Sequence, residues 1–290
     1  MSVAWGVARA MRPAQWVKNG FIFAPLFFAQ KVNDSGRVVA AALAFAAFCA
    51  AASAVYLLND VIDRDFDREH PEKASRPIAS GLVPASVALW IALLLAVAAL
   101  GGAFALKVPL GLAVTFYLVL NVAYSLKLKE IVILDVFIVS LGFVIRVFAG
   151  AIAIDVAASS WLLACTIFLA LFLAVAKRRG EITEGNGTAA RFRQILGEYD
   201  VSLLDQLTAI TAALALVSYA LYTLDHHTVE RLGPNLVFTL PIVAYGIFRY
   251  LYLVHRHGKG GSPTRVVLTD PHIVLSALAW GGATAIIIYL

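Results

Sequence analysis

The chain has 290 residues, of which 61% are hydrophobic and only 14% are charged, and its mean hydropathy is +0.84. A soluble fold carries about a quarter of charged residues, so this composition excludes an ordinary water-soluble protein and indicates one that lies in a bilayer. Cys49 and Cys165 each lie in an apolar run, so the sequence indicates neither a disulfide framework nor a zinc site.

Nine apolar segments follow one another along the chain, and no linker or composition break separates them. Most reach the length of about 20 residues that a bilayer-spanning helix needs, whereas the first and fourth are short and are expected to tilt or to lie among neighbours. The sequence therefore predicts an all-α membrane protein of about nine transmembrane helices in a single domain, 1–290. The segments lie at residues 16–29, 38–58, 85–106, 110–124, 131–154, 160–176, 204–224, 235–254 and 271–290.

Lysine and arginine are distributed unevenly over the loops between these segments. If the N-terminus is cytoplasmic, the outer side holds only Lys31, Arg37, Lys107 and Arg231, and all other basic loop residues are inside. The long charged loops at 59–84, 177–203 and 255–270 then face the cytoplasm, where we expect the active site. This asymmetry explains the net charge of +5 without a nucleic-acid partner. The prediction is a multi-pass protein of the cell (inner) membrane.

The densest group of charges follows the second segment, in the run NDVIDRDFD that begins at Asn59. If the helix continues to about Asp67, its period places Asn59, Asp60, Asp63 and Asp67 on one face, with Asp65 on the far side. Carboxylates this close repel unless a cation lies between them, and oxygen ligands in a half-open ring suit Mg²⁺. The alternative is a solvated helix end whose acids pair with neighbouring basic residues, Arg64, Arg68 and Lys73.

Two further polar groups follow the fourth and sixth segments. Asn121, Tyr124 and Ser125 are spaced to share a helix face, and Lys127 and Lys129 come directly after them. An interfacial tyrosine followed by cytoplasmic lysines is the structural alternative. The run Lys177, Arg178, Arg179, Gly180, Glu181 either interacts with the dipole at a helix C-terminus or binds phosphate oxygens, and the residues alone leave both interpretations open.

Arg146 is the one charge that falls well inside an apolar segment, where a charge costs about 2.5–3.5 kcal/mol. Gly142 and Gly150 lie one turn on either side of it, which predicts a close approach of another helix, and Asp135 lies on nearly the same face. Arg146 is therefore either half of a buried structural pair or a ligand for a lipid phosphate.

The run NDVIDRDFD, followed by RPIASG, resembles the first aspartate-rich motif, NDxxDxxxD, of the UbiA superfamily of intramembrane prenyltransferases. The resemblance covers nearly the whole chain and implies the nine-helix bundle of that superfamily. Usual members carry a second aspartate-rich motif after the sixth span, and the two motifs together hold Mg²⁺ on a prenyl diphosphate. Here that position reads KRRGEITE, where cations replace the aspartates.

One branch of the superfamily, the decaprenyl-phosphate phosphoribosyltransferases, accommodates this departure. The segments that resemble it are RPAQWVKN, HPEKASRPIASG, YSLKLK, KRRGE, FRYLYLVH and GGSPTRVVLTD. The resemblance implies transfer of 5-phosphoribosyl from phosphoribosyl pyrophosphate to a polyprenyl (decaprenyl) phosphate, with Mg²⁺ as cofactor, for arabinan and cell-wall precursors. It also suggests a homo-oligomer.

A donor with a diphosphate at one end and a 5-phosphate at the other suits one metal site plus a basic cluster. Asn59, Asp60, Asp63 and Asp67 are the expected metal ligands, and the three aspartates are the expected catalytic residues. The expected substrate-binding residues are Lys73, Arg76, Tyr124, Lys127, Lys129, Arg146, Lys177, Arg178, Arg179 and Glu181.

Two other functions remain open from the sequence. A prenyltransferase that joins a prenyl diphosphate to an aromatic or glycerol-phosphate acceptor would share the fold and the first motif, but a second acidic cluster would be expected in place of KRRGE. A transporter of lipid phosphates would place polar groups near the bilayer midplane on broken helices. This chain has Arg146 there, while its acids gather at one end of the predicted bundle.

Overall fold

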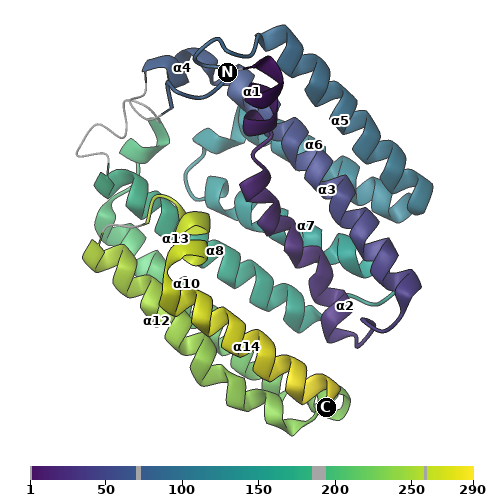
Figure 1. Cartoon of the computed structure of the whole chain (residues 1–290). Helices are drawn as coiled ribbons and strands as arrows, with labels where there is room; N and C mark the ends of the chain where they lie inside the picture. The colour runs from purple at the N-terminus through teal and green to yellow at the C-terminus, as the bar shows by residue number, and fades with distance from the viewer. Residues whose placement is uncertain (1, 70–72, 185–193, 258–259) are drawn as a thin grey trace. The chain divides into compact units, whose positions relative to one another are not determined.

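The chain is described by a computed structural model over residues 2–69, 73–184, 194–257 and 260–290. Every regular element in these residues is an α-helix or a 3-10 helix (Figure 1), which confirms the predicted all-α class. Within the described ranges, eight helical segments are long and apolar enough to cross a membrane. The protein is therefore a multi-pass membrane protein.

The chain divides into two compact units, residues 1–138 with 142–158, and residues 139–141 with 159–290. The elements of the first unit are α1 (Val3–Ala10), η1 (Pro13–Phe23), α2 (Ala24–Phe28), α3 (Ser35–Ile62), α4 (Arg64–Glu69), α5 (Ala85–Leu106), α6 (Val108–Leu126), η2 (Leu128–Glu130) and most of α7 (Leu134–Ala153). The second unit contains α8 (Ser160–Glu184), η3 (Gln194–Gly197), α10 (Val201–Leu224), α11 (His226–Leu232), η4 (Pro234–Thr239), α12 (Leu240–His257), α13 (Pro263–Thr269) and α14 (Pro271–Tyr289). The prediction of a single domain stays a prediction.

The first predicted span differs from the others because it is mostly 3-10 helix. Pro25 has no N–H to donate to Phe21 four residues earlier, and the Ala24 N–H donates to the Phe21 carbonyl instead, at the three-residue spacing of a 3-10 helix. A 3-10 helix rises about 2.0 Å per residue, so η1 and α2 together extend roughly 30 Å, about the thickness of the hydrocarbon core. This segment has fewer residues than the long apolar helices, but its reach is still enough to cross the hydrocarbon core.

In the first unit, α3 packs against both α5 and α6 (Figure 1). The 3-10 helix η1 is attached to α3 by two side-chain hydrogen bonds, from Trp16 Nε1 to Ser53 Oγ at 3.1 Å and from Asn19 Nδ2 to Cys49 Sγ at 3.2 Å. A Cβ atom on Gly150 would lie 2.1 Å from the Ile22 carbonyl oxygen. The predicted close approach at Gly150 is therefore confirmed, and the partner is η1.

In the second unit, α8 packs along α10, and α12 packs along α14. Phe172 and Tyr250 meet edge to face in the core of this unit, with ring centroids 5.3 Å apart. Asp270 caps α14 by accepting from the His272 and Ile273 N–H groups and also binds the Arg249 guanidinium through both carboxylate oxygens. The FRYLYLVH and LTD segments of the sequence are thus joined by one residue pair.

Candidate functional site

The acidic motif lies at the junction of α3 and α4. Asp63 ends α3, but the Asp63 N–H still donates to the Asn59 carbonyl and the Asp67 N–H to the Asp63 carbonyl. Helical spacing therefore continues through the junction. The side chains of Asp60 and Asp67 are only 2% and 5% exposed, whereas that of Asp65 is 74% exposed. The predicted separation of Asp65 from the other aspartates is confirmed.

Asp65 has the partners that the solvated alternative predicted. Its carboxylate accepts from Arg64 Nε at 3.0 Å and lies 3.5 Å from Arg68 Nη1. Arg64 holds the pKa of the Asp65 carboxyl below its usual range. The interpretation as a solvated helix end is therefore correct for this exposed residue. The two buried aspartates have other partners.

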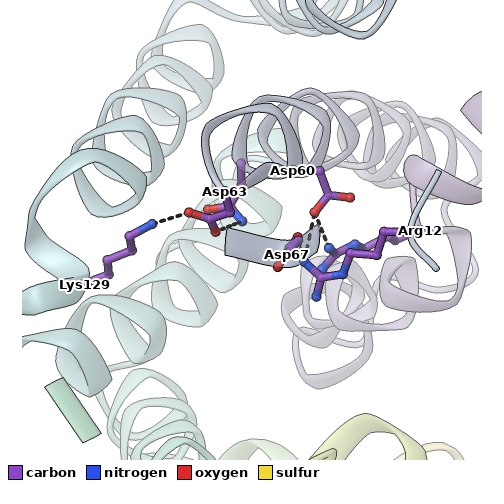
Figure 2. Close-up of polar contacts among 7 residues, drawn as sticks. Arg12, Asp60, Asp63, Asp67 and Lys129 are labelled. Carbon is purple, nitrogen blue, oxygen red and sulfur yellow. Dashed lines mark hydrogen bonds and ion pairs between the residues drawn. The ribbon is translucent and has the colours of Figure 1, made fainter. Parts of the chain in front are cut away.

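Arg76 and Arg12 neutralise the two buried aspartates, as Figure 2 shows for Arg12. Arg76 Nη1 lies 2.6 Å from Asp67 Oδ2 and 3.3 Å from Asp60 Oδ1. Arg12 Nη2 lies 2.5 Å from the same Asp60 oxygen, and its guanidinium stacks over the Tyr56 ring, 5.0 Å from the centroid. One oxygen of Asp60 thus receives two guanidinium groups.

The loop after α4 is anchored so that Arg76 is held in place. Ile78 and Val83 are each 1% exposed and belong to the same core cluster as Leu57 of α3. Arg68 Nε donates to the Ala79 carbonyl at 2.9 Å. Gly81 has a φ of +81°, a conformation that glycine adopts without steric cost. The sequence RPIASG therefore forms a packed turn rather than a free loop.

Asp63 has a separate set of partners. Its Oδ1 lies 2.7 Å from Lys129 Nζ, and its Oδ2 accepts from Asn59 Nδ2 at 2.9 Å (Figure 2). Lys129 lies in η2, just after α6, so this ion pair joins the ends of α3 and α6. The neighbouring Lys127 is exposed at the end of α6. The structure thus distinguishes two lysines that the sequence treated alike.

The four predicted metal ligands do not converge on one point. Across the part of the chain that the structure describes, no three His, Cys, Asp or Glu side chains are grouped to hold a metal ion. The physical reason is charge neutralisation, because basic side chains pair with all three carboxylates: Arg12 and Arg76 with Asp60, Arg76 with Asp67, and Lys129 with Asp63. Among the described residues, Asp60 Oδ2 and Asp67 Oδ1 remain without a partner. Two carboxylate oxygens fit Mg²⁺, which commonly takes one or two carboxylates together with substrate phosphates.

Three other predicted substrate-binding residues lie in the first unit. Lys73 and Tyr124 are both half-buried, and each has interactions within the protein. Arg146 is 6% exposed. Its guanidinium donates to Asn19 Oδ1 at 2.7 Å, to the Gly142 carbonyl at 2.7 Å and to the Tyr117 hydroxyl at 2.9 Å, and it stacks over the Tyr117 ring. The sequence left two roles open for Arg146, a structural one and that of a lipid-phosphate ligand. These partners favour the structural role.

The KRRGE run lies within α8 in the second unit, one to two turns before the described end of the helix. The last described turn of α8, which ends at Glu184, contains no basic residue, so the described helix end gives no support to the helix-dipole interpretation. Glu181 pairs with Lys177 Nζ at 3.3 Å and with Arg178 Nη1 at 2.6 Å. The side chain of Lys177 is 42% exposed, whereas that of Arg178 is 3% exposed.

Arg179 has different partners. Its Nε donates to the Asp205 carboxylate, its Nη1 donates to the Val254 carbonyl at 3.1 Å, and His255 Nε2 lies 3.2 Å from the same Asp205 carboxylate. Arg179 therefore joins α8 to α10 and α12, and these contacts stabilise the packing of the three helices.

Gly180 brings the KRRGE and GGSPTR segments into contact. A Cβ atom on Gly180 would lie 2.2 Å from the Gly261 nitrogen, and the Gly261 N–H donates to Glu184 Oε1 at 3.1 Å. Only glycine allows an approach this close. Two segments that sequence reasoning named separately thus form one packed corner of the second unit.

Sequence reasoning missed Arg12 and Asp205 as partners of predicted site residues. Arg12 lies 48 positions from Asp60 along the chain, and Asp205 lies 26 positions from Arg179. The available signal for Arg12 was the RPAQWVKN segment, which begins at this arginine. No local pattern marks Asp205.

Comparison with known proteins agrees with this geometry. The sequence profile of the UbiA prenyltransferase family matches residues 20–268. Decaprenyl-phosphate phosphoribosyltransferase of Corynebacterium glutamicum is 34% identical over 100% of this chain and 88% of its own length. The protein of the same name from Mycolicibacterium smegmatis is 35% identical over 98% of this chain and 92% of its own.

The solved structure of a UbiA homologue from Archaeoglobus fulgidus, bound to GPP and Mg²⁺, superposes with a TM-score of 0.74 at 18% sequence identity. The alignment covers 97% of this chain and 99% of that one, so the likeness concerns the fold of the whole chain. Together with the profile match and the relatives above, it establishes that the chain is a member of the UbiA prenyltransferase family of membrane enzymes.

Proposed function

We propose that this protein transfers the 5-phosphoribosyl group of phosphoribosyl pyrophosphate to a polyprenyl (decaprenyl) phosphate and releases pyrophosphate. The observation that carries the proposal is that buried Asp60 and Asp67 and half-buried Asp63 pair with three basic side chains of the same unit. These are Arg12, Arg76 and Lys129. Such a site offers carboxylate oxygens as metal ligands and N–H groups that can donate hydrogen bonds to phosphate oxygens. The names of the relatives that are about 35% identical over nearly the full length support the same reaction.

In this proposal, Asp60 and Asp67 supply protein oxygens for Mg²⁺, which would neutralise the negative charge that develops on the leaving pyrophosphate. Asn59 and Asp63, the other ligands predicted from the sequence, hold each other and Lys129 in the structure. Their metal ligation stays a prediction.

Arg76 is suited to bind the pyrophosphate directly. Its Nη1 serves both buried aspartates, and a guanidinium has five N–H donors in a planar fork that matches phosphate oxygens. Its other nitrogens have no partner among the described residues. Arg12 shares Asp60 with Arg76, so the two arginines hold that carboxylate in one orientation while the Arg76 fork stays available.

The acceptor needs no general base. A phosphate monoester has a second pKa of about 6, so the lipid phosphate is already an anion at neutral pH and can attack the anomeric carbon as the pyrophosphate leaves. We expect a displacement with oxocarbenium character. Lys73, Tyr124, Lys127, Lys177, Arg178, Arg179 and Glu181 remain proposed substrate contacts, the last four because they occupy the sequence position of the family's second aspartate-rich motif.

The proposed location is the cytoplasmic face of the cell (inner) membrane, because the basic loops are predicted to lie there. The proposed role is the supply of a phosphoribosylated lipid for arabinan and cell-wall precursors. A homo-oligomer is also proposed, on the resemblance alone.

One other reaction has a specific observation in its favour. The Archaeoglobus fulgidus homologue of the same fold was solved with GPP, so transfer of a prenyl group from a prenyl diphosphate to another acceptor is the second candidate. The cationic run KRRGE in place of a second acidic motif argues against it.

A transfer assay on purified protein separates the two reactions. One reaction contains radiolabelled phosphoribosyl pyrophosphate and decaprenyl phosphate, with or without Mg²⁺, and a parallel reaction contains a prenyl diphosphate and 4-hydroxybenzoate. Metal-dependent label in the lipid phase of the first reaction is the expected result. Product in the second reaction alone would contradict the proposal and favour a prenyl-diphosphate transferase.

A further inference from the structure

Ser53 in α3 carries a fully buried hydroxyl with two partners outside its own helix. The Ser53 Oγ accepts from Trp16 Nε1 at 3.1 Å and donates to the Met11 carbonyl at 3.2 Å. An indole N–H only donates and a carbonyl only accepts, so the direction of both hydrogen bonds is fixed. Ser53 therefore anchors α3 to the backbone at the end of α1.

The anchored residue, Met11, comes directly before Arg12. Its carbonyl lies at the C-terminal end of α1, where backbone carbonyls lack partners within the helix. Arg12 then has a φ of 54° and a ψ of 60°, in the left-handed region that residues with large side chains rarely adopt unless surrounding contacts hold them. The hydrogen bond from Ser53 is one of the contacts that hold this turn.

Three side chains on one face of α3 contact the turn at residues 11 and 12. A rotation of about 100° per residue places Ser53, Tyr56 and Asp60 within about 60° of one another around the helix. Ser53 binds the backbone of the turn. The Tyr56 ring lies against the Arg12 guanidinium, and Asp60 Oδ1 accepts from Arg12 Nη2 (Figure 2). This face of α3 thus fixes both the backbone and the side chain of Arg12.

We propose that Ser53 is a positioning residue for donor binding, because it holds the turn from which Arg12 reaches Asp60. The proposal rests on the proposed function, since that function supplies the pyrophosphate group that Arg76 binds. While Arg12 neutralises Asp60, Arg76 serves both buried aspartates through one nitrogen, Nη1, and the rest of its guanidinium is available to the donor. Without the Ser53 hydroxyl the turn loosens and Arg12 leaves Asp60 more often. Arg76 is then drawn further onto that carboxylate and away from the pyrophosphate.

Ser53→Ala and Thr115→Val test the proposal by kinetics. Each removes one hydroxyl from the first unit, but Thr115 donates to the Gly111 carbonyl within its own helix, α6. Ser53→Ala is expected to raise the KM for phosphoribosyl pyrophosphate about fivefold, the effect of one ordinary hydrogen bond, and to keep the KM for decaprenyl phosphate. Thr115→Val is expected to keep both values, and Ser53→Thr, which retains the hydroxyl, to keep the donor KM. An unchanged donor KM in Ser53→Ala would overturn the proposal even if the Tm fell, because the hydroxyl would then only stabilise the fold.

Modification of Arg12 by the arginine reagent phenylglyoxal tests the positioning without turnover. The Arg12 side chain is 28% exposed, and the internal reference is Arg64, which is 38% exposed and pairs with Asp65. In Ser53→Ala, mass spectrometry is expected to show that Arg12 reacts several times faster than in the unsubstituted protein, while Arg64 reacts at the same rate. Equal Arg12 rates would overturn the proposal. If Arg12 reacts faster in the variant but the unsubstituted protein forms no phosphoribosyl lipid, the proposed function fails and the assignment of Ser53 as the anchor of Arg12 holds.

Discussion

At the residue scale, the chemistry of the acidic motif depends on which carboxylate oxygens are already bound. Asp63 has a partner on each oxygen, whereas Asp60 and Asp67 each bind basic side chains through one oxygen. A buried carboxylate with one anchored oxygen is held in a defined orientation. Less side-chain entropy is then lost when it binds a metal ion. We therefore expect the aspartates of the motif to have at least two different roles.

Asp67→Asn and Asp65→Asn form a matched pair in the short helix α4. Asp67 is buried against Arg76, whereas Asp65 is exposed and pairs with Arg64. Asp67→Asn is expected to lower phosphoribosyl transfer by more than about 100-fold, since changing even a partner of a metal ligand costs about 10- to 100-fold. Asp65→Asn is expected to keep normal transfer. The transfer rates of the two variants are measured at saturating Mg²⁺. Similar rates would contradict the assignment of Asp67 as a metal ligand.

Arg146→Ala decides between the two roles of that arginine. The substitution removes the hydrogen bonds to Asn19, Gly142 and Tyr117 and leaves buried polar groups unpaired, so it is expected to cost about 3 kcal/mol of stability or more. Thermal unfolding in detergent measures this loss. If the Tm is unchanged and the KM for polyprenyl phosphate rises instead, Arg146 is a lipid-phosphate ligand.

Lys177→Ala tests the cationic run on α8. Its partly exposed pair with Glu181, four residues on in the same helix, contributes only about 0.3–0.5 kcal/mol, so the Tm is expected to change little. Loss of a charge-assisted hydrogen bond to phosphate costs about 1.5–3 kcal/mol, so the KM for phosphoribosyl pyrophosphate is expected to rise roughly tenfold or more. An unchanged KM would assign Lys177 a structural role.

At the scale of elements, glycines determine how closely segments approach one another. Gly150 brings α7 against η1, and η1 in turn begins directly after Arg12, the partner of Asp60. Arg12 itself has a φ of 54°, in the left-handed region, where the chain turns from α1 into η1. The position of a site arginine thus depends on how a 3-10 helix packs on α3 and α7.

Gly150→Ala is expected to destabilise the protein by more than about 1 kcal/mol, because the new Cβ would lie 2.1 Å from the Ile22 carbonyl oxygen and the two elements must separate. Gly102→Ala in α5 is the control, since a Cβ there meets no atom within 4 Å. It is expected to be neutral or to stabilise by about 0.5–1 kcal/mol through helix propensity. Thermal unfolding compares the two, and equal Tm values would contradict the close packing of η1 on α7.

At the scale of the whole molecule, the basic loops predict which side of the membrane each polar segment faces. The loop at 59–84, which carries the acidic motif, is predicted to be cytoplasmic, and the segment around His227 is predicted to be outside. Asp65 and His227 both have exposed side chains. They are therefore suitable positions for a labelling test of orientation.

Asp65→Cys and His227→Cys are expected to react differently with a membrane-impermeant maleimide. On intact cells only His227→Cys is expected to be labelled, and after permeabilisation both are. The unsubstituted chain is the control for Cys49, which is buried, and Cys165, which is partly buried. The opposite pattern would place the acidic motif outside the cell and contradict the proposed cytoplasmic site.

The sequence by itself determined the helical class, the long spans and the placement of Asp60 and Asp67 on a different helix face from Asp65. These properties depend on hydropathy over about 20 residues and on the helical period, both of which are local. Tertiary structure alone decided that Arg12 binds Asp60 across 48 positions, that Lys129 rather than Lys127 binds Asp63 across 66, and that Asn19 binds Arg146 across 127. Such pairs depend on how distant helices pack, which no local pattern encodes.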